Sequence, residues 1–316
     1  MNRYALFIAF LFFAISTNAQ KTDSTKNTSS TDSLMNSLAG KPAAEPVIAT
    51  FKSTRLILSQ TTETVKKGNL NFLVIHRFGD IGGSAGGSPT LWGFDNSSDI
   101  YIGFEYGLTN DLDIDFGRSK LEQLLDLQLK YAIVRQKSDE SVPLAITLIG
   151  KTGLKPYKVT TNVFDTYSNR LNYLAQALIA RKFSPQFSLQ LTPTFLRTNL
   201  PYPYLPGNEQ QLFAMGVAGR IKITKRMGIV FDYQHPFSNF RQNSTNPIFY
   251  DPLAFGIEIE TGGHVFTINF TNAQAISEIN YLSDTESSWT KGQFRLGFTI
   301  SRIFDLNPKH KGTFNK

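Results

Sequence analysis

Hydrophobic and polar residues alternate with a period of two along most of the chain after Asn69. In residues 100–108 the even positions are Ile, Ile, Phe, Tyr and Leu, whereas the odd positions include Gly103, Glu105 and Gly107. The same alternation returns in residues 125–133, 213–223, 227–234, 255–260 and 294–300. A period of two is typical of β-strands that have one apolar face. The pattern therefore predicts an all-β fold.

The alternating stretches predict about twelve strands, with a range of roughly 10–14. They lie at 69–77, 99–109, 111–118, 124–136, 142–153, 170–182, 186–197, 211–223, 227–235, 254–261, 264–271 and 292–304. The connections alternate in length. Short ones at 110, 137–141, 183–185, 224–226 and 262–263 are interleaved with long ones at 78–98, 154–169, 198–210, 236–253 and 272–291, and 119–123 is the one short exception among the latter. Short turns on one side and long loops on the other are typical of outer-membrane barrels.

Alternation alone leaves the compartment open, because soluble sandwiches and lipocalin-like barrels produce the same pattern with the apolar face inward. Two features favour the membrane. The strands have the length of a tilted membrane-spanning strand, about 9–11 residues, whereas globular strands average about 5–6. The chain also has 26 Phe and 12 Tyr, many near strand ends, as an interfacial aromatic girdle requires. We predict an antiparallel transmembrane β-barrel in the outer membrane of a Gram-negative bacterium.

The first residues predict export. A basic start at Arg3 precedes an apolar run at 4–15, and Thr17 and Ala19 supply the small side chains that a signal peptidase accepts. We predict a signal peptide at 1–19 that is cleaved after Ala19. Polar residues 20–49 are predicted to be a disordered linker, residues 50–305 the barrel, and residues 306–316 a polar C-terminal tail.

Residues 50–60 do not fit this arrangement. Their sequence, TFKSTRLILSQ, reads as a strand, but an additional strand makes the number odd and places the N-terminus outside the cell. We therefore interpret the segment as periplasmic or as folded back toward the barrel mouth, with an extra strand at the seam as the alternative.

The same stretches resemble a bacterial family known as a membrane-bound β-barrel domain of unknown function. The resemblance rests on HRFG at 76–79, LWGFD at 91–95, FEYGLT at 104–109, GRS at 117–119, LKY at 129–131, PTF at 193–195, DPL at 251–253, EIETGGHVF at 258–266, FTN at 270–272 and ISRIF at 300–304. It covers roughly residues 50–305 and implies a fold and a location, but no activity. In one respect the chain departs from outer-membrane barrels in general. Such barrels commonly end on an aromatic residue that the insertion machinery reads, whereas here Phe304 precedes a polar tail.

Composition limits the chemistry and the partners. The net charge of +7 is spread along the chain and no basic helix or Lys/Arg-rich run is present, so nucleic acid is not expected as a partner. Membrane lipid, including anionic headgroups, and the outer-membrane insertion machinery are the expected partners. The absence of cysteine excludes disulfides and thiolate metal sites.

Enzyme and cofactor sites receive little support. The glycine-rich run at 82–89 lacks the Lys-Ser/Thr of a phosphate-binding loop and favours a flexible external loop. Outer-membrane phospholipases have a His and a Ser two residues apart, whereas His76, His235 and His264 are each followed two residues later by Phe. Glu258 and Glu260 before the Gly262–Gly263 turn allow a bound cation, but pairing with lumenal Lys or Arg is favoured. We expect no catalytic site, metal or cofactor.

The polar positions of the alternation predict the lining of the lumen. The candidates are Glu105, Asp113, Asp115, Asp126, Lys130, Lys151, Arg220, Lys222, Asp232, Glu258, Glu260 and Arg295. Charges of both signs must pair or stay hydrated, so the lumen is either a narrow water-filled pore or a salt-bridged plug. We predict a pore or small-solute uptake channel. The alternatives are a non-conducting barrel with a structural or ligand- or partner-binding role, and a soluble periplasmic β-carrier.

Overall fold

Twelve antiparallel strands form a closed barrel in the computed structural model, which describes residues 45–47, 49–156, 166–200 and 207–306. Each strand pairs with its sequence neighbour, and β1 pairs with β12 to close the ring. The strands are β1 (Asn69–Phe78), β2 (Ser97–Gly107), β3 (Leu112–Ser119), β4 (Leu125–Val134), β5 (Ala145–Leu154), β6 (Leu171–Lys182), β7 (Phe187–Thr198), β8 (Gln211–Lys222), β9 (Met227–Phe237), β10 (Leu253–Thr261), β11 (His264–Thr271) and β12 (Arg295–Asp305). The predicted fold class and strand number are confirmed, and every predicted strand end lies within three residues of the observed one.

The two faces of the barrel wall have opposite chemistry. Outward side chains such as Phe116 and Leu129 are half exposed, at 50% and 51%, whereas the inward Asp115 and Lys130 are only 5% and 1% exposed. A water-soluble protein places apolar groups inside, so this reversal is what a barrel surrounded by lipid requires.

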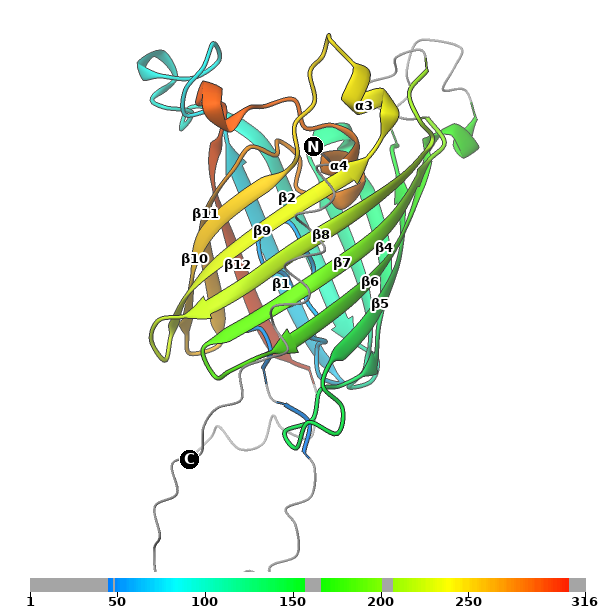
Figure 1. Cartoon of the computed structure of the whole chain (residues 1–316), viewed down its shortest axis with the longest axis vertical. Helices are drawn as coiled ribbons and strands as arrows, with labels where there is room; N and C mark the ends of the chain where they lie inside the picture. Colours follow the sequence, from blue (N-terminus) through cyan, green and yellow to red (C-terminus); the bar gives the residue numbers. More distant parts are fainter. Residues whose placement is uncertain (1–44, 48, 157–165, 201–206, 307–316) are drawn as a thin grey trace, which may run out of the picture. The chain divides into compact units, whose positions relative to one another are not determined.

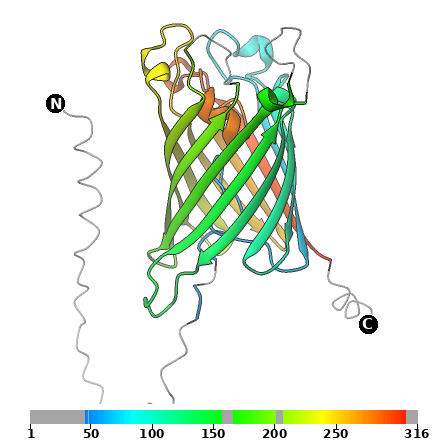
Figure 2. The ribbon, with the colours of Figure 1, turned by 90° about the vertical axis from the view of Figure 1, so that its right-hand side faces the viewer.

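Short turns gather at one end of the barrel and long loops at the other (Figure 1). The strands run obliquely around the barrel (Figure 2), as ring closure requires. The long loops hold two short α-helices, α3 (Asn239–Asn243) and α4 (Glu278–Ser283), and three 3-10 turns, η2 (Ser88–Thr90), η5 (Tyr167–Arg170) and η6 (Trp289–Lys291). A further 3-10 turn, η3 (Leu121–Gln123), lies in the short β3–β4 connection. No helix among the described residues is long and apolar enough to cross a membrane.

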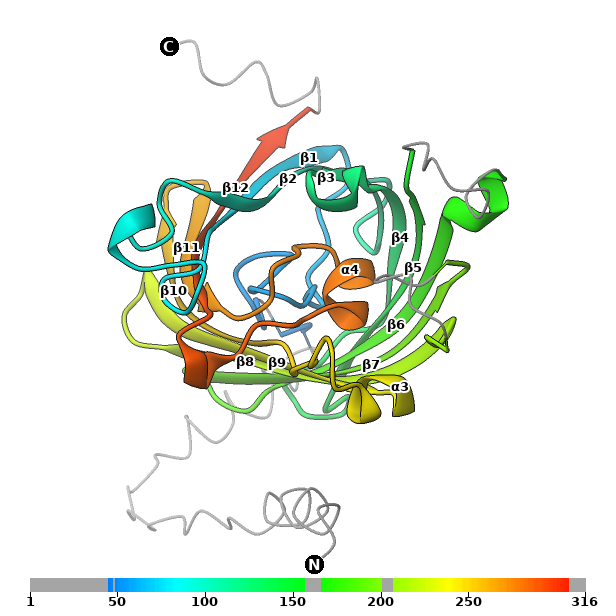
Figure 3. The ribbon, with the colours of Figure 1, turned by 90° about the horizontal axis from the view of Figure 1, so that it is seen from above.

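The barrel interior is occupied by two pieces of the chain. Viewed from above, the segment that precedes β1 and the segment that carries α4 both lie within the ring of strands (Figure 3). We call residues 50–62 the plug segment and residues 272–285 the inward loop. The alternative of an extra strand at 50–60 is wrong: this stretch has only one isolated bridge, between Arg55 and Gln60.

The plug segment enters and leaves the lumen at the short-turn end. Before it, Pro46 bridges to Lys137 in the β4–β5 turn, and after it the Gly68 amide donates to the Gly107 carbonyl at the end of β2. The inward loop reaches the lumen from the opposite end, because it joins β11 to β12. The predicted signal peptide 1–19, residues 20–44 and 48 of the predicted linker and residues 307–316 of the tail lie outside the described residues.

Candidate functional site in the barrel lumen

The twelve lumen candidates all lie in strands, on the inward side of the wall. Ten of them are buried, and Lys222 and Glu260, near the short-turn end, are half-buried. Because a water-filled lumen would leave these charged side chains solvated, their burial means that other parts of the chain cover them.

A buried cluster of charges joins the plug segment to the inward loop. Arg55 of the plug segment donates from Nη2 to Glu278 Oε1 at 2.8 Å, and Lys151 of β5 reaches Glu278 Oε2 at 2.6 Å. Lys151 also lies 3.9 Å from Asp126, which accepts a hydrogen bond of 2.9 Å from the Tyr101 hydroxyl. Arg55 and Glu278 are 1% and 0% exposed. Since an uncompensated buried charge is costly, each member depends on the others for its place.

Asp232 of β9 anchors the tip of the plug segment. Its Oδ2 accepts the Leu58 amide at 2.9 Å and the Ser59 amide at 2.6 Å, and its Oδ1 accepts the Ser59 hydroxyl at 2.8 Å. Gln234 adds a hydrogen bond of 2.7 Å from Nε2 to Ser59 Oγ. Because no regular strand pairing satisfies these two plug amides, a carboxylate takes that role.

The inward loop is held by charged groups on β1 and β2. Arg77 donates from Nη1 to the carbonyls of Ala273 and Ala275, and Asp99 accepts the Ile276 amide at 2.8 Å. The loop in turn contacts the plug segment, since the Tyr281 hydroxyl donates to the Leu58 carbonyl at 3.3 Å. The two inner segments therefore support one another.

One side of the lumen is apolar. Leu56, Ile57 and Leu58 of the plug segment belong to a single buried cluster with inward side chains of β5 to β10 and with the inward loop. The wall members are Ile149, Leu174, Leu178, Ala180, Leu196, Leu212, Ala214, Ala218, Val230 and Ala254. Burial of each large aliphatic side chain contributes about 1.5–3 kcal/mol, so this face supplies much of the plug's docking energy.

The opposite side of the lumen, formed by β1 to β4, is mostly polar, and its apolar members Leu73, Ile75 and Tyr101 form a small buried cluster with Ile276 of the inward loop. Asn71 donates to Glu105 at 2.8 Å, the Val65 amide donates to Asp113 Oδ2 at 2.9 Å, and Gln128 donates to Asp115 Oδ2 at 2.5 Å. The Oδ1 atoms of Asp113 and Asp115 have no hydrogen-bond partner among the described residues. Acceptors of this kind are rare in dry protein cores and are readily satisfied by water.

The carboxylates near the β10–β11 turn are paired. Arg220 Nε lies 2.6 Å from Glu258, and Lys52 of the plug segment lies 2.9 Å from Glu260. Gly262 and Gly263 have φ of +46° and +109°, which the turn requires and glycine tolerates. Among the described residues no group of three or more His, Cys, Asp or Glu has an arrangement that holds a metal ion.

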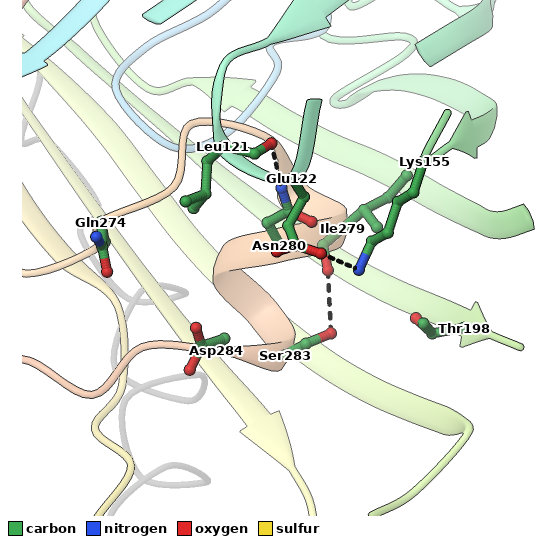
Figure 4. Close-up of a pocket in the computed structure, with 9 residues that line it drawn as sticks. All are labelled: Leu121, Glu122, Lys155, Thr198, Gln274, Ile279, Asn280, Ser283 and Asp284. Carbon is green, nitrogen blue, oxygen red and sulfur yellow. Dashed lines mark hydrogen bonds and ion pairs between the residues drawn. The ribbon is translucent and has the colours of Figure 1, made fainter. Parts of the chain in front are cut away.

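A small cavity of about 60 Å³ lies beside α4 at the long-loop end (Figure 4). Lys155 pairs with Glu122 at 3.0 Å on one side of it, and the Asn280 side chain donates from Nδ2 to the Leu121 carbonyl at 3.4 Å. On the helix itself, Ser283 donates to the Ile279 carbonyl at 3.0 Å. The cavity is too small for an organic solute and is not a binding pocket in this conformation. The contacts around it hold α4 against the wall.

Asp284, directly after α4, is a half-buried carboxyl group whose pKa is well above its ordinary value. Burial and the neighbouring Glu286 carboxylate raise the pKa of Asp284 from 3.8 to about 7, while Arg241 opposes the change. Between about pH 4 and pH 7, Asp284 is therefore mostly protonated in the docked loop and mostly ionised in the undocked loop.

This proton gives the inward loop a pH-dependent stability. A group whose pKa is raised by docking stabilises the docked state below its free pKa and loses that contribution as the pH rises through the docked pKa. Docking is therefore expected to weaken between about pH 4 and pH 7 and to change little above that range. Hydrogen exchange of the α4 amides, corrected for the intrinsic rate, measures this. Asp284→Asn is expected to flatten the profile, and an unchanged slope in that variant would assign the dependence to other groups.

Several important lumen residues are not predicted by the alternation of polar and apolar positions. Arg55 and Glu278 lie outside the strands, in stretches with no period of two, and Arg77 and Asp99 sit at strand ends next to a long loop. For Arg55, the residue type itself indicates a buried ion pair. An arginine inside the apolar run RLIL at 55–58 has to find a counter-charge if that run is buried.

The closed ring, the apolar outside and the charged inside together define a transmembrane β-barrel. The chain belongs to the family described as "Membrane bound beta barrel domain (DUF5777)", whose model matches residues 51–304. This confirms the family resemblance and makes the protein membrane-bound. The match includes the plug segment from Phe51 onward as well as the strands.

Several solved outer-membrane proteins are similar in structure. The NanC porin has a TM-score of 0.47 at 10% identity, covering 74% of this chain and 98% of that chain. The KdgM porin has a TM-score of 0.42 at 6% identity, covering 75% and 99%. The outer membrane protein Omp33 of Acinetobacter baumannii has a TM-score of 0.39 at 9% identity, covering 75% and 99%. A comparison with curated protein sequences found no match.

Proposed function

We propose that this protein is an outer-membrane channel for small hydrophilic solutes, closed in the described conformation by the plug segment and the inward loop. Passage then requires displacement of the plug segment from the lumen. Membrane lipid and the outer-membrane insertion machinery remain its expected partners, and the predicted cleavable signal peptide accounts for its export.

The polar half of the lumen is the observation that carries this proposal. Carboxylates at Asp113 and Asp115 face inward from β3, each with one oxygen that has no partner among the described residues. A barrel evolved only to be filled gains nothing from unsatisfied buried acceptors, which each cost about 1–3 kcal/mol. In a wall that becomes hydrated when the plug segment leaves, these oxygens accept hydrogen bonds from water.

The path of the plug segment supports its release. Both of its ends lie at the short-turn end of the barrel, next to Lys137 and Gly107, so the segment can withdraw as a loop without threading through the ring. Its polar contacts, to Asp232, Glu278 and Glu260, involve charged groups that water can satisfy after withdrawal.

A non-conducting barrel is the second candidate. The apolar cluster that joins Leu56, Ile57 and Leu58 to the wall favours it, because withdrawal exposes that cluster to water. The two functions differ in one measurable property, the current through a barrel whose plug segment is out.

Asp232→Asn tests the proposal. The amide loses the charge that holds the Leu58 and Ser59 amides, and hydrogen bonds to a charged group contribute roughly 1.5–3 kcal/mol, so plug release is expected to rise about tenfold or more. Planar-bilayer recordings are expected to show brief openings in the natural protein and more frequent ones in the variant. Asp139→Asn, on an exposed turn, is the matched control.

Plug position must be followed independently of current. The chain has no cysteine, so Ser53→Cys in the plug segment provides a unique thiol whose reactivity toward a bulky maleimide reports release. Current that rises with thiol reactivity supports a channel. A reactive thiol without current in Asp232→Asn, both alone and with Leu174→Ser and Leu178→Ser added, refutes the channel and leaves the non-conducting barrel.

A further inference from the structure

Three large apolar side chains are exposed together in the loop between β1 and β2. Leu91, Trp92 and Phe94 are 53%, 54% and 51% exposed. We call these three residues the aromatic shelf. They lie beyond the end of β1, outside the membrane-spanning strands. Contiguous apolar groups on a loop are unfavourable in water and usually mark a contact surface.

The backbone holds the aromatic shelf in one conformation. Leu91, Trp92 and Gly93 have successive left-handed φ values of +46°, +51° and +87°. The Trp92 amide donates to the Gly87 carbonyl at 2.8 Å, and the Gly79 amide donates to the Gly93 carbonyl at 2.9 Å. The side chains are therefore presented by an ordered turn that is tied to the end of β1.

The aromatic shelf continues the lipid-facing surface of the barrel. Phe94 packs on Phe78 with ring centroids 5.1 Å apart, and Phe78 lies 6.2 Å from Phe298. Phe78 and Phe298 occupy the outward positions of β1 and β12. Two backbone hydrogen bonds, from Ile81 to Phe294 and from Gly82 to Gly292, fasten the same loop to the stretch just before β12.

The loop leans away from the lumen. Seen from above, the cyan β1–β2 loop projects outside the ring of strands (Figure 3), and from the side it stands at the long-loop end beyond the wall (Figure 1). A lid over the mouth would lean the other way. The direction and the contact with Phe78 place the aromatic shelf against whatever surrounds the barrel.

We infer that the aromatic shelf inserts into the lipid leaflet at the long-loop end, at the boundary between headgroups and acyl chains. Tryptophan favours this boundary because its ring is apolar and its N–H is polar. Burial of the three side chains in lipid removes the cost of their exposure, and it fixes the height of the β1–β2 loop at the membrane surface. The inference rests on the membrane-bound fold and is independent of whether the lumen conducts.

Tryptophan fluorescence tests this directly, because the chain has only Trp92 and Trp289. Trp289→Phe leaves Trp92 as a single reporter, and Trp92→Phe leaves Trp289, which stacks on Phe294 at 4.7 Å. The full chain is reconstituted in phosphatidylcholine vesicles, and only protein that floats with vesicles after a carbonate wash is measured. Brominated phosphatidylcholines quench from known depths, and acrylamide quenches from water.

Trp92 is expected to show a blue-shifted emission, a marked loss of intensity with bromine near the glycerol end of the acyl chain, a smaller loss with deeper bromine, and little loss with acrylamide. Strong quenching by acrylamide without quenching by bromolipid would overturn the inference. So would a protected Trp92 that ignores bromolipid and becomes accessible when the protein is diluted with lipid, since that behaviour identifies a second copy of the chain as the contact.

Discussion

Glu278→Ala is expected to release the plug segment and to mobilise the inward loop together. Glu278 holds Arg55 at 2.8 Å and Lys151 at 2.6 Å, and all three side chains are buried. Loss of the carboxylate leaves the Arg55 guanidinium uncompensated, and breaking a buried pair in this way costs about 3–5 kcal/mol. The equilibrium between docked and released plug should then shift by roughly two to four orders of magnitude.

The thiol of Ser53→Cys measures this shift. Its rate of modification is compared in the Glu278→Ala and natural backgrounds, in folded barrels that keep their heat-dependent mobility on gels. Arg55→Met combined with Glu278→Gln is the informative control, because it removes the guanidinium and leaves Lys151 near Asp126 and a neutral amide. This double variant is expected to recover most of the protection.

Two outcomes would contradict the interpretation. Equal modification rates in Glu278→Ala and in the natural protein would mean that the apolar contacts alone hold the plug segment. A double variant as reactive as Glu278→Ala would mean that the cost lies in the loss of packing and not in the unpaired charge of Arg55.

The wall of this barrel was predictable because a strand has a simple rule. Every second residue shares a face, so the alternation of Phe104 and Glu105 or of Leu129 and Lys130 indicates both the strand and its two surroundings. The glycine pair at Gly262–Gly263 likewise marks a hairpin by its conformational needs alone. The alternation thus predicts twelve strands, and the connection lengths orient their ends.

The filling of the barrel was harder to predict because it depends on contacts between distant residues. Arg55 meets Glu278, more than two hundred positions away, and Ser59 meets Asp232. Neither inner segment has a period of two, since the plug segment is irregular and the inward loop contains only the short helix α4. The polar groups of both segments are satisfied largely by wall side chains. A lumen of mixed charge was compatible with a pore or with a plug, and only the positions of these partners distinguish the two in the described conformation.

Replacement of Leu56, Ile57 and Leu58 together by serine is expected to have the largest effect on conductance. These side chains bind the plug segment to the apolar side of the lumen, and truncation of one buried aliphatic side chain costs about 2–5 kcal/mol. These three residues belong to none of the twelve strands, so their replacement leaves the strand pairing of the ring intact. The wall should therefore persist while the plug segment leaves. Planar-bilayer recordings should then show long-lived, ohmic openings. Lys66→Ala with Lys67→Ala, on the exposed exit of the segment, is the control.

The emptied lumen has an apolar side, and this side affects the current that the triple variant carries. Leu174 and Leu178 of β6 then face the channel, and a narrow apolar lining can exclude water and block current even when no chain obstructs it. Addition of Leu174→Ser and Leu178→Ser to the triple variant is therefore expected to increase the current further. A released plug segment with no current in either background would refute the channel, because hydration of both sides of the lumen would then have failed to open a path.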